Sequence, residues 1–97
     1  MRVRVKTRAA RQVETAAAWW ADHRPAAPGA IRLDLQAALA LLAEHPGIGT
    51  RVENAHDPST RRLYLARTRY FVYYRVKGRY LDVIAFWHAS RDGTPSV

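Results

Sequence analysis

The sequence predicts an α+β fold with the element order β-α-α-β-β-β, in which a helical hairpin packs on one face of an antiparallel sheet. Two observations indicate this class. Apolar residues in the first half of the chain recur every three or four positions, the period of amphipathic helices. In the second half the period changes to two, as in strands. The 97 residues, 48% of them hydrophobic, supply one core, so we expect a single domain over residues 1–97.

The N-terminal residues predict one short strand. Residues 2–6 alternate basic side chains with Val3 and Val5, which is the pattern of a half-buried strand. Thr7 then offers an N-cap for a helix. We expect this strand to join the sheet at one side.

Two helices follow the first strand. The first has apolar positions at spacings of three and four from Arg8 onward, until Pro25 and Pro28 interrupt it. The second extends from Ala30 to Glu44 and carries an apolar stripe before a His-Pro-Gly stop. Because the link between them is short and contains proline, we expect an antiparallel hairpin of helices.

Three strands are predicted after the helices. Residues 47–59 contain glycine, asparagine and proline without periodicity and are expected to form a loop. One strand then surrounds Leu63, a second spans 70–76 and a third spans 81–87, with a tight turn at 76–79. The last strand is nearly continuous in apolar residues, which favours a central position. We expect these three strands to form an antiparallel meander.

Alternation around Leu63 assigns the two faces of the sheet. Leu63 and Leu65 point to one face, and Arg62 and Tyr64 point to the other. We therefore expect the face away from the helices to be open, basic and aromatic. Guanidinium groups and aromatic rings together can bind phosphates and bases or receive an acidic peptide. The alternative for any single tyrosine is a packing role across the strands.

The charge of the chain is strongly basic and unevenly distributed. The net charge is +8, and the basic residues are almost all arginines. Residues 1–12 and 59–81 contain no acid. Arginine favours planar, bidentate contacts with phosphate or carboxylate, so this charge predicts a polyanion or an acidic protein as partner. The alternative is that the charge only keeps the protein soluble.

Several classes of protein are disfavoured by the sequence. It contains no cysteine, and its four histidines lack a paired metal-binding spacing, so we expect neither disulfides nor a metal or other cofactor. Gly47 and Gly49 do not form a phosphate loop, and no serine has the GxSxG context of hydrolases. Neither an apolar export signal nor a membrane-spanning stretch is present, so we expect a cytoplasmic protein without a membrane partner.

Three segments carry a resemblance to a known family. These are LLAEHPGIGTR after the second helix, TRRLYLARTRYFVYYRV, and IAFWHASRD near the C-terminus. In this order and spacing the chain resembles the toxins of the ParE and RelE superfamily, from Val3 to about Asp92. The resemblance implies a bacterial type II toxin–antitoxin system, as encoded in plasmid stabilisation loci. Such toxins are held inactive by a cognate acidic antitoxin whose toxin-binding segment folds on them.

The two branches of this superfamily differ in target. ParE-like members inhibit DNA gyrase, whereas RelE-like members cut messenger RNA at the ribosome without a metal, using a cluster of lysine and arginine and a nearby tyrosine or histidine. Here only Lys6 and Lys77 are present, and no tyrosine follows Arg91. The chain is therefore closer to ParE, and we expect a gyrase-directed toxin that is not an enzyme. The alternatives are a ribosome-dependent endoribonuclease using Arg62, His88 and Arg91, or a non-toxic binding module with the same fold.

The resemblance and the alternation together give candidate binding residues. The residues expected to contact the target are Arg61, Arg62, Arg69, His88 and Arg91. The residues expected to contact the antitoxin are Trp19, Trp20 and Tyr64. Because Trp19 and Trp20 are adjacent on a helix, both cannot enter the same core, and one is exposed or covered by a partner. His88 has the alternative of capping the end of the sheet.

Overall fold

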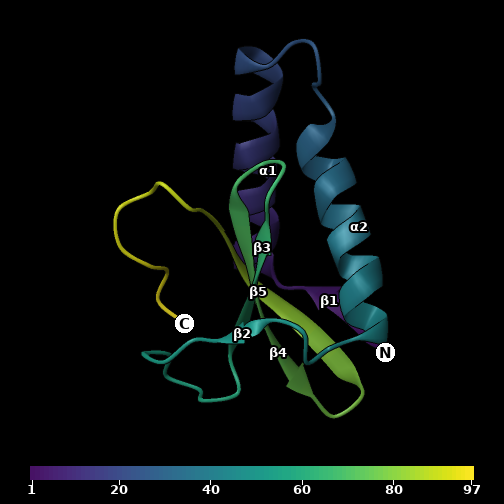
Figure 1. Ribbon diagram of the computed structural model, residues 1–97, viewed down its shortest axis with the longest axis vertical. Coiled ribbons are helices and arrows are strands. Elements are labelled where there is room, and N and C mark those ends of the chain that lie inside the picture. The colour runs from purple at the N-terminus through teal and green to yellow at the C-terminus, as the bar shows by residue number, and fades with distance from the viewer.

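The protein contains two helices and a five-stranded sheet (Figure 1), and the computed structural model describes all of residues 1–97. The elements are β1 (Arg2–Val5), α1 (Thr7–His23), α2 (Ala30–Glu44), β2 (Thr50–Arg51), β3 (Arg61–Leu65), β4 (Tyr70–Lys77) and β5 (Tyr80–His88). The predicted α+β class, with the helices before the main strands, is confirmed.

The strands lie in the order β1-β5-β4-β3-β2. The predicted meander of β3, β4 and β5 is antiparallel, and β1 joins at one side, as expected. However, β1 runs parallel to β5, so the sheet is mixed: it has one parallel pair, and its other pairs are antiparallel as expected. A short hairpin forces neighbouring strands to be antiparallel, whereas the long chain between β1 and β5 permits the parallel arrangement.

Two local expectations are also corrected. The segment 47–59 is not only a loop, because Thr50 and Arg51 form β2 and pair with β3. A strand of two residues is too short to show a period of two. Thr7 is the first residue of α1 and not its N-cap; Lys6 holds that position without a side-chain cap. The backbone N–H of Lys6 donates to Val83 O at 2.9 Å, so the chain passes directly from strand pairing into the helix.

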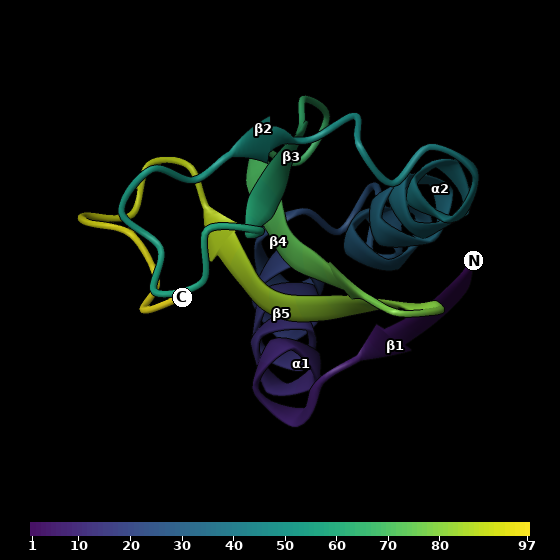
Figure 2. The same ribbon diagram turned by 90° about the horizontal axis from the view of Figure 1, so that it is seen from below.

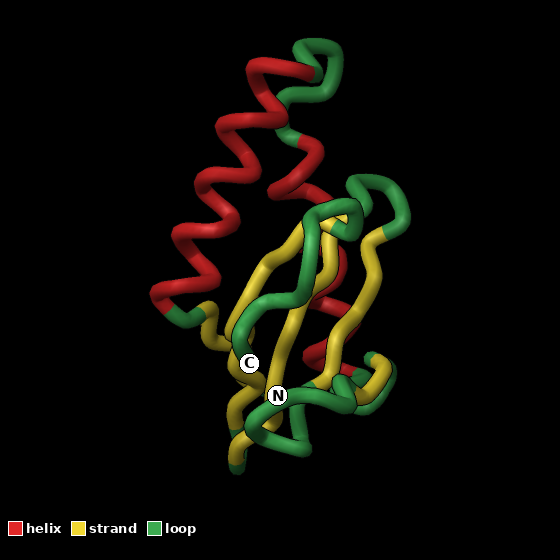
Figure 3. Tube along the Cα trace, turned by 90° about the vertical axis from the view of Figure 1, so that its left-hand side faces the viewer, coloured by secondary structure: helices red, strands yellow, loops and turns green.

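Both helices cover the same face of the sheet (Figure 2), and the main core lies between these layers. From α1 the core receives Ala9, Val13 and Ala16, and from α2 it receives Ile31, Leu35, Ala38 and Leu42. The helical hairpin extends past the strands at the end where α1 and α2 meet (Figure 3). The last turn of α1 therefore projects from the body of the molecule.

The opposite face of the sheet is partly covered by the C-terminal residues, which form the yellow loop of Figure 1. Val97 is buried against Tyr73 and Ala85. Its carbonyl oxygen accepts hydrogen bonds from Arg75 Nη2 at 2.6 Å and from the backbone N–H of His56 at 3.1 Å. This face is thus less open than the alternation predicts, because a segment without periodicity folds back over its middle.

Tyr74 joins the end of α2 to the sheet. Its hydroxyl donates to Pro46 O at 2.7 Å and accepts from the backbone N–H of Gly49 at 2.9 Å. A Cβ on Gly49 would lie 2.8 Å from the backbone oxygen of Arg62, so only glycine fits this crossing without a shift. Burial raises the pKa of Tyr74, which keeps the hydroxyl protonated and able to donate.

An ion pair joins the edge strand β1 to β5. The guanidinium of Arg4 donates to both carboxylate oxygens of Asp82, from Nε at 2.7 Å and from Nη2 at 3.1 Å, and it stacks on the ring of Tyr80. The hydrogen bond from Arg4 lowers the pKa of Asp82 below its ordinary value of 3.8, although burial acts in the opposite direction. The ionised carboxylate therefore stabilises the folded state.

This ion pair predicts an acid-dependent loss of stability. Because the pKa of Asp82 is lower in the folded than in the unfolded protein, its contribution is present above about pH 4 and is lost as the pH falls through the folded pKa. Asp82→Asn should lower stability at neutral pH, and the difference from the native chain should narrow below about pH 4. Denaturant unfolding at several pH values measures the free energy of unfolding of the native chain and of Asp82→Asn. The substitution Asp92→Asn, at an exposed position, is the control. A difference that stays constant with pH would contradict this role.

Candidate interaction surfaces

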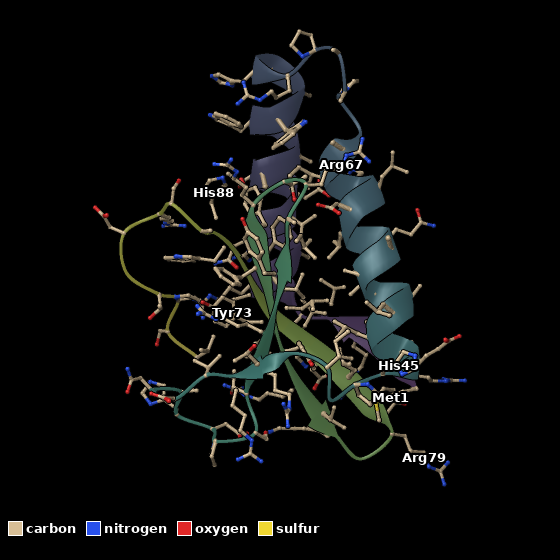
Figure 4. The ribbon with its side chains drawn as sticks, in the orientation of Figure 1. Met1, His45, Arg67, Tyr73, Arg79 and His88 are labelled. Carbon is tan, nitrogen blue, oxygen red and sulfur yellow. The ribbon has the colours of Figure 1, made fainter.

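Arg62 lies on the face of the sheet away from the helices, where alternation places it. Its guanidinium carbon is 4.2 Å from the centre of the Phe71 ring, and its Nη1 donates to Tyr73 Oη at 3.3 Å. Tyr64 lies beside the same Phe71 ring, with 5.1 Å between ring centres, and is 46% exposed. Figure 4 labels Tyr73, the buried neighbour of this group. Arg62 is therefore held in place by packing while its charge stays near the surface.

Arg91 also stacks on an aromatic ring, which belongs to β5, the neighbour of β4. Its guanidinium carbon lies 3.7 Å from the centre of the Trp87 ring. Trp87 is the partner of Phe71 in the β4–β5 register, and both rings pack on the face that Val97 covers. Arg62 and Arg91 thus each stack on one member of a cross-strand aromatic pair. We call Arg62, Phe71, Trp87 and Arg91 the arginine–aromatic face.

Arg61 and Arg69 do not join this face. Arg61 Nη1 donates to Gly49 O at 2.7 Å, and its side chain lines a small cavity of ≈ 260 Å³ beside Tyr74. Arg69 is exposed in the β3–β4 turn with φ of 64°, a left-handed conformation, and its carbonyl oxygen accepts from the N–H of Ala89 at 2.8 Å. Arg61 therefore points away from Arg62, and Arg69 lies in a turn outside the strands that carry the arginine–aromatic face.

His88 lies at the end of β5 and packs edge to face on Tyr70, with 4.8 Å between ring centres. Its Nδ1 accepts a hydrogen bond from the backbone N–H of Ser90 at 3.1 Å and lies 2.7 Å from the Ser90 hydroxyl. Since a ring nitrogen that accepts carries no proton, the neutral imidazole has its proton on Nε2. Burial raises the pKa of Tyr70, so the neighbouring hydroxyl stays protonated.

A cavity of ≈ 610 Å³ lies between α1 and the ends of β4 and β5; we call it the α1 cavity. It brings Trp19, expected at the antitoxin interface, together with His88 and Arg91, expected at the target interface. Arg11, Gln12 and Thr15 of α1 also line it and were not predicted. The spacing of Arg11, Thr15 and Trp19, four residues apart on α1, is the sequence signal that places them on one side of the helix.

Trp19 and Trp20 differ in exposure, as their adjacency predicts. Trp19 is 47% exposed and stacks on His23 with 4.3 Å between ring centres. Trp20 is half-buried against the main core, and its buried indole N–H has no acceptor. Trp19, on the projecting end of α1, is thus the member of the pair that can meet a partner.

The three residues of the nuclease alternative do not form one group. His88 packs on Tyr70, which contacts the main core beneath the helices, whereas Arg62 packs with Tyr73 on the opposite face. Arg91 stacks on Trp87 and also lines the α1 cavity with His88, so Arg62 is the residue that the sheet separates from His88. Acid–base cleavage at one phosphate requires its groups within hydrogen-bond reach of that phosphate.

Neither α1 nor α2 combines the length and the apolar composition that a membrane-spanning helix needs.

Comparisons with known proteins identify the family. No curated protein gives a significant match to the sequence. The solved structure titled "Chromosomal ParDE TA system from P. aeruginosa" is 16% identical and superposes with a TM-score of 0.66, over 93% of this chain and 97% of that chain, which shows a shared fold. Residues 3–93 match the family described as "ParE toxin of type II toxin-antitoxin system, parDE". The chain belongs to this ParE toxin family and is the toxin component of a type II toxin–antitoxin system.

Proposed function

We propose that this toxin acts by binding and inhibiting DNA gyrase through its arginine–aromatic face. The family assignment supports a binding toxin, and the separation of Arg62 from His88 by the sheet carries the argument against cleavage, because a nuclease needs both groups at one phosphate. Arg62 and Arg91 are supported by rings on the same face, so their orientation costs little entropy when a partner binds. Arginine with aromatic neighbours is the usual composition of protein-binding hot spots.

The toxin is neutralised by its cognate antitoxin, and we also propose where the antitoxin binds on the toxin. The charge of +8 favours an acidic segment. The exposed rings of Trp19 and Tyr64 offer apolar anchors on α1 and β3. Beyond the two-residue β2, residues 63–65 have no strand on their outer side, so an added strand can pair there. We also infer that residues 1–97 form one domain that acts in the cytoplasm.

The proposal predicts the order in which cellular processes fail. After induction of the toxin, negative supercoiling of a reporter plasmid should decline before protein synthesis does, and the purified toxin should inhibit supercoiling by purified gyrase. Sequencing of message ends in the same cells is the control for RNA cleavage. If translation stops first and messages are cut in the ribosomal A site, with the cuts lost in His88→Ala, the toxin is an endoribonuclease and our proposal fails.

A further inference from the structure

The α1 cavity is built from side chains that the structure holds in defined positions. Gln12 Oε1 accepts the backbone N–H of Phe86 at 2.8 Å, which leaves the amide NH₂ of Gln12 as a donor. The backbone N–H of Arg91 donates to His88 O at 3.1 Å and so closes the turn that follows β5. One wall of the cavity is therefore the helix α1, and the other is a turn closed by a hydrogen bond. Hydrogen bonds hold both walls in place.

The polar lining of the α1 cavity is suited to an anion. Arg11 and Arg91 supply charge, and none of the lining residues is acidic. Since Nδ1 of His88 is an acceptor for Ser90, its Nε2–H is a further donor. Thr15 and Ser90 add hydroxyl groups. Two guanidinium groups with an imidazole N–H form the kind of donor set that binds phosphate through charge-assisted hydrogen bonds.

The apolar lining of the same cavity is suited to a flat ring. Tyr70 and Phe86 stack face to face with 4.5 Å between ring centres and an angle of 4°, and Trp19 lines the side nearest the projecting end of α1. The volume of ≈ 610 Å³ falls within the range of about 300 to 1,000 Å³ that is typical of small-molecule sites. An acidic peptide side chain would use the guanidinium groups and leave the rings without a partner.

We propose that the α1 cavity binds a nucleoside phosphate. Arg11, Arg91 and the Nε2–H of His88 hold the phosphate, and the base lies against Trp19. The ligand is either a free nucleotide or a nucleotide at the end of a single strand, because both present the same phosphate and base. Arg91 belongs to both the α1 cavity and the arginine–aromatic face, whereas Arg11 and Trp19 line the cavity and lie outside that face, so Arg11→Ala separates nucleotide binding from gyrase inhibition.

Calorimetric titration of the purified full chain tests this site without gyrase or antitoxin. The probes are AMP, ADP, adenosine, inorganic phosphate, a four-nucleotide single strand and a glutamate-rich peptide. We expect ADP to bind, and adenosine or phosphate alone to bind at least about tenfold more weakly, because each keeps only half of the contacts. Arg11→Ala and Arg91→Ala should each weaken ADP binding about tenfold or more, the equivalent of one charge-assisted hydrogen bond.

Two further variants make the test specific. Trp19→Ala should weaken ADP more than inorganic phosphate, because it removes only the stacking surface. Arg79→Ala removes a charge from the β4–β5 turn, at the opposite end of the molecule from His88 (Figure 4), and should leave binding unchanged. Circular dichroism checks that every variant is folded. If Trp19→Ala does not fold, quenching of tryptophan emission by ADP in the native chain replaces it.

Each outcome decides the proposal. Tighter binding of the single strand than of ADP, with the same dependence on Arg11, identifies a strand end as the source, and the reverse identifies a free nucleotide. No binding of any nucleotide overturns the site. Equal binding of phosphate and ADP shows an anion site without base recognition and also overturns it. Tighter binding of the glutamate-rich peptide, lost in Arg11→Ala, shows a protein interface instead.

Discussion

Replacing Arg62 or Arg91 by alanine is expected to abolish growth arrest while the protein remains folded and bound by its antitoxin. Both guanidinium groups stack on a cross-strand aromatic pair and keep their charge accessible. Loss of an arginine hot spot weakens a protein interface by 2 kcal/mol or more, which is about thirtyfold in affinity. The stability cost should be about 1 kcal/mol or less, the value of an exposed cation–π contact with one hydrogen bond.

The measurement compares three properties of each variant: growth arrest, gyrase inhibition and the thermal melt. Arg79→Ala is the matched control, because it removes the same charge from an exposed turn outside the arginine–aromatic face. Two results would contradict the assignment. Either the variants unfold, in which case the arginines are structural, or they fold and remain fully toxic, in which case the target binds another surface.

Leu42→Ala should destabilise the protein by about 2 to 5 kcal/mol, because Leu42 is 0% exposed and alanine leaves a cavity in the main core. Its neighbour Leu41 is 43% exposed on the same helix, so Leu41→Ala should cost less than about 0.5 kcal/mol. Both residues are leucines on α2, so the two substitutions change helix propensity equally and differ in the burial of the side chain. Urea unfolding measures the free energy of unfolding of each variant. An equal loss in the two variants would show that α2 does not pack as described. Toxicity and antitoxin binding should fall together in Leu42→Ala, unlike in the arginine variants.

The periodicity of the sequence predicts the faces of individual elements well. Leu65 is buried in the main core and Leu63 packs against it, while Arg62 and Tyr64 lie on the other face, because a strand alternates whatever its neighbours are. The exposure of Trp19 beside the half-buried Trp20 follows in the same way from the geometry of a helix. These features depend only on residues close in sequence.

Features that join distant segments were not predictable from local patterns. The burial of Val97 against Tyr73 depends on hydrogen bonds from Arg75 and His56, and nothing in the sequence around Val97 indicates a partner. The grouping of Arg61 with Arg62 was a local inference, and the sheet separates them because consecutive residues of a strand face opposite sides. The α1 cavity combines α1 with a turn that follows β5, so only the fold reveals it.

The pairing of β1 with β5 also sets the order in which the protein can fold during translation. Arg4 and Asp82, which join these strands, are 78 positions apart in the chain. Contacts within the helical hairpin form early, whereas contacts between distant segments form late because closing a long loop costs chain entropy. The sheet cannot be completed until β5 has left the ribosome, and Arg91 emerges later still. The nascent chain therefore lacks its proposed target-binding surface until after β5 is made.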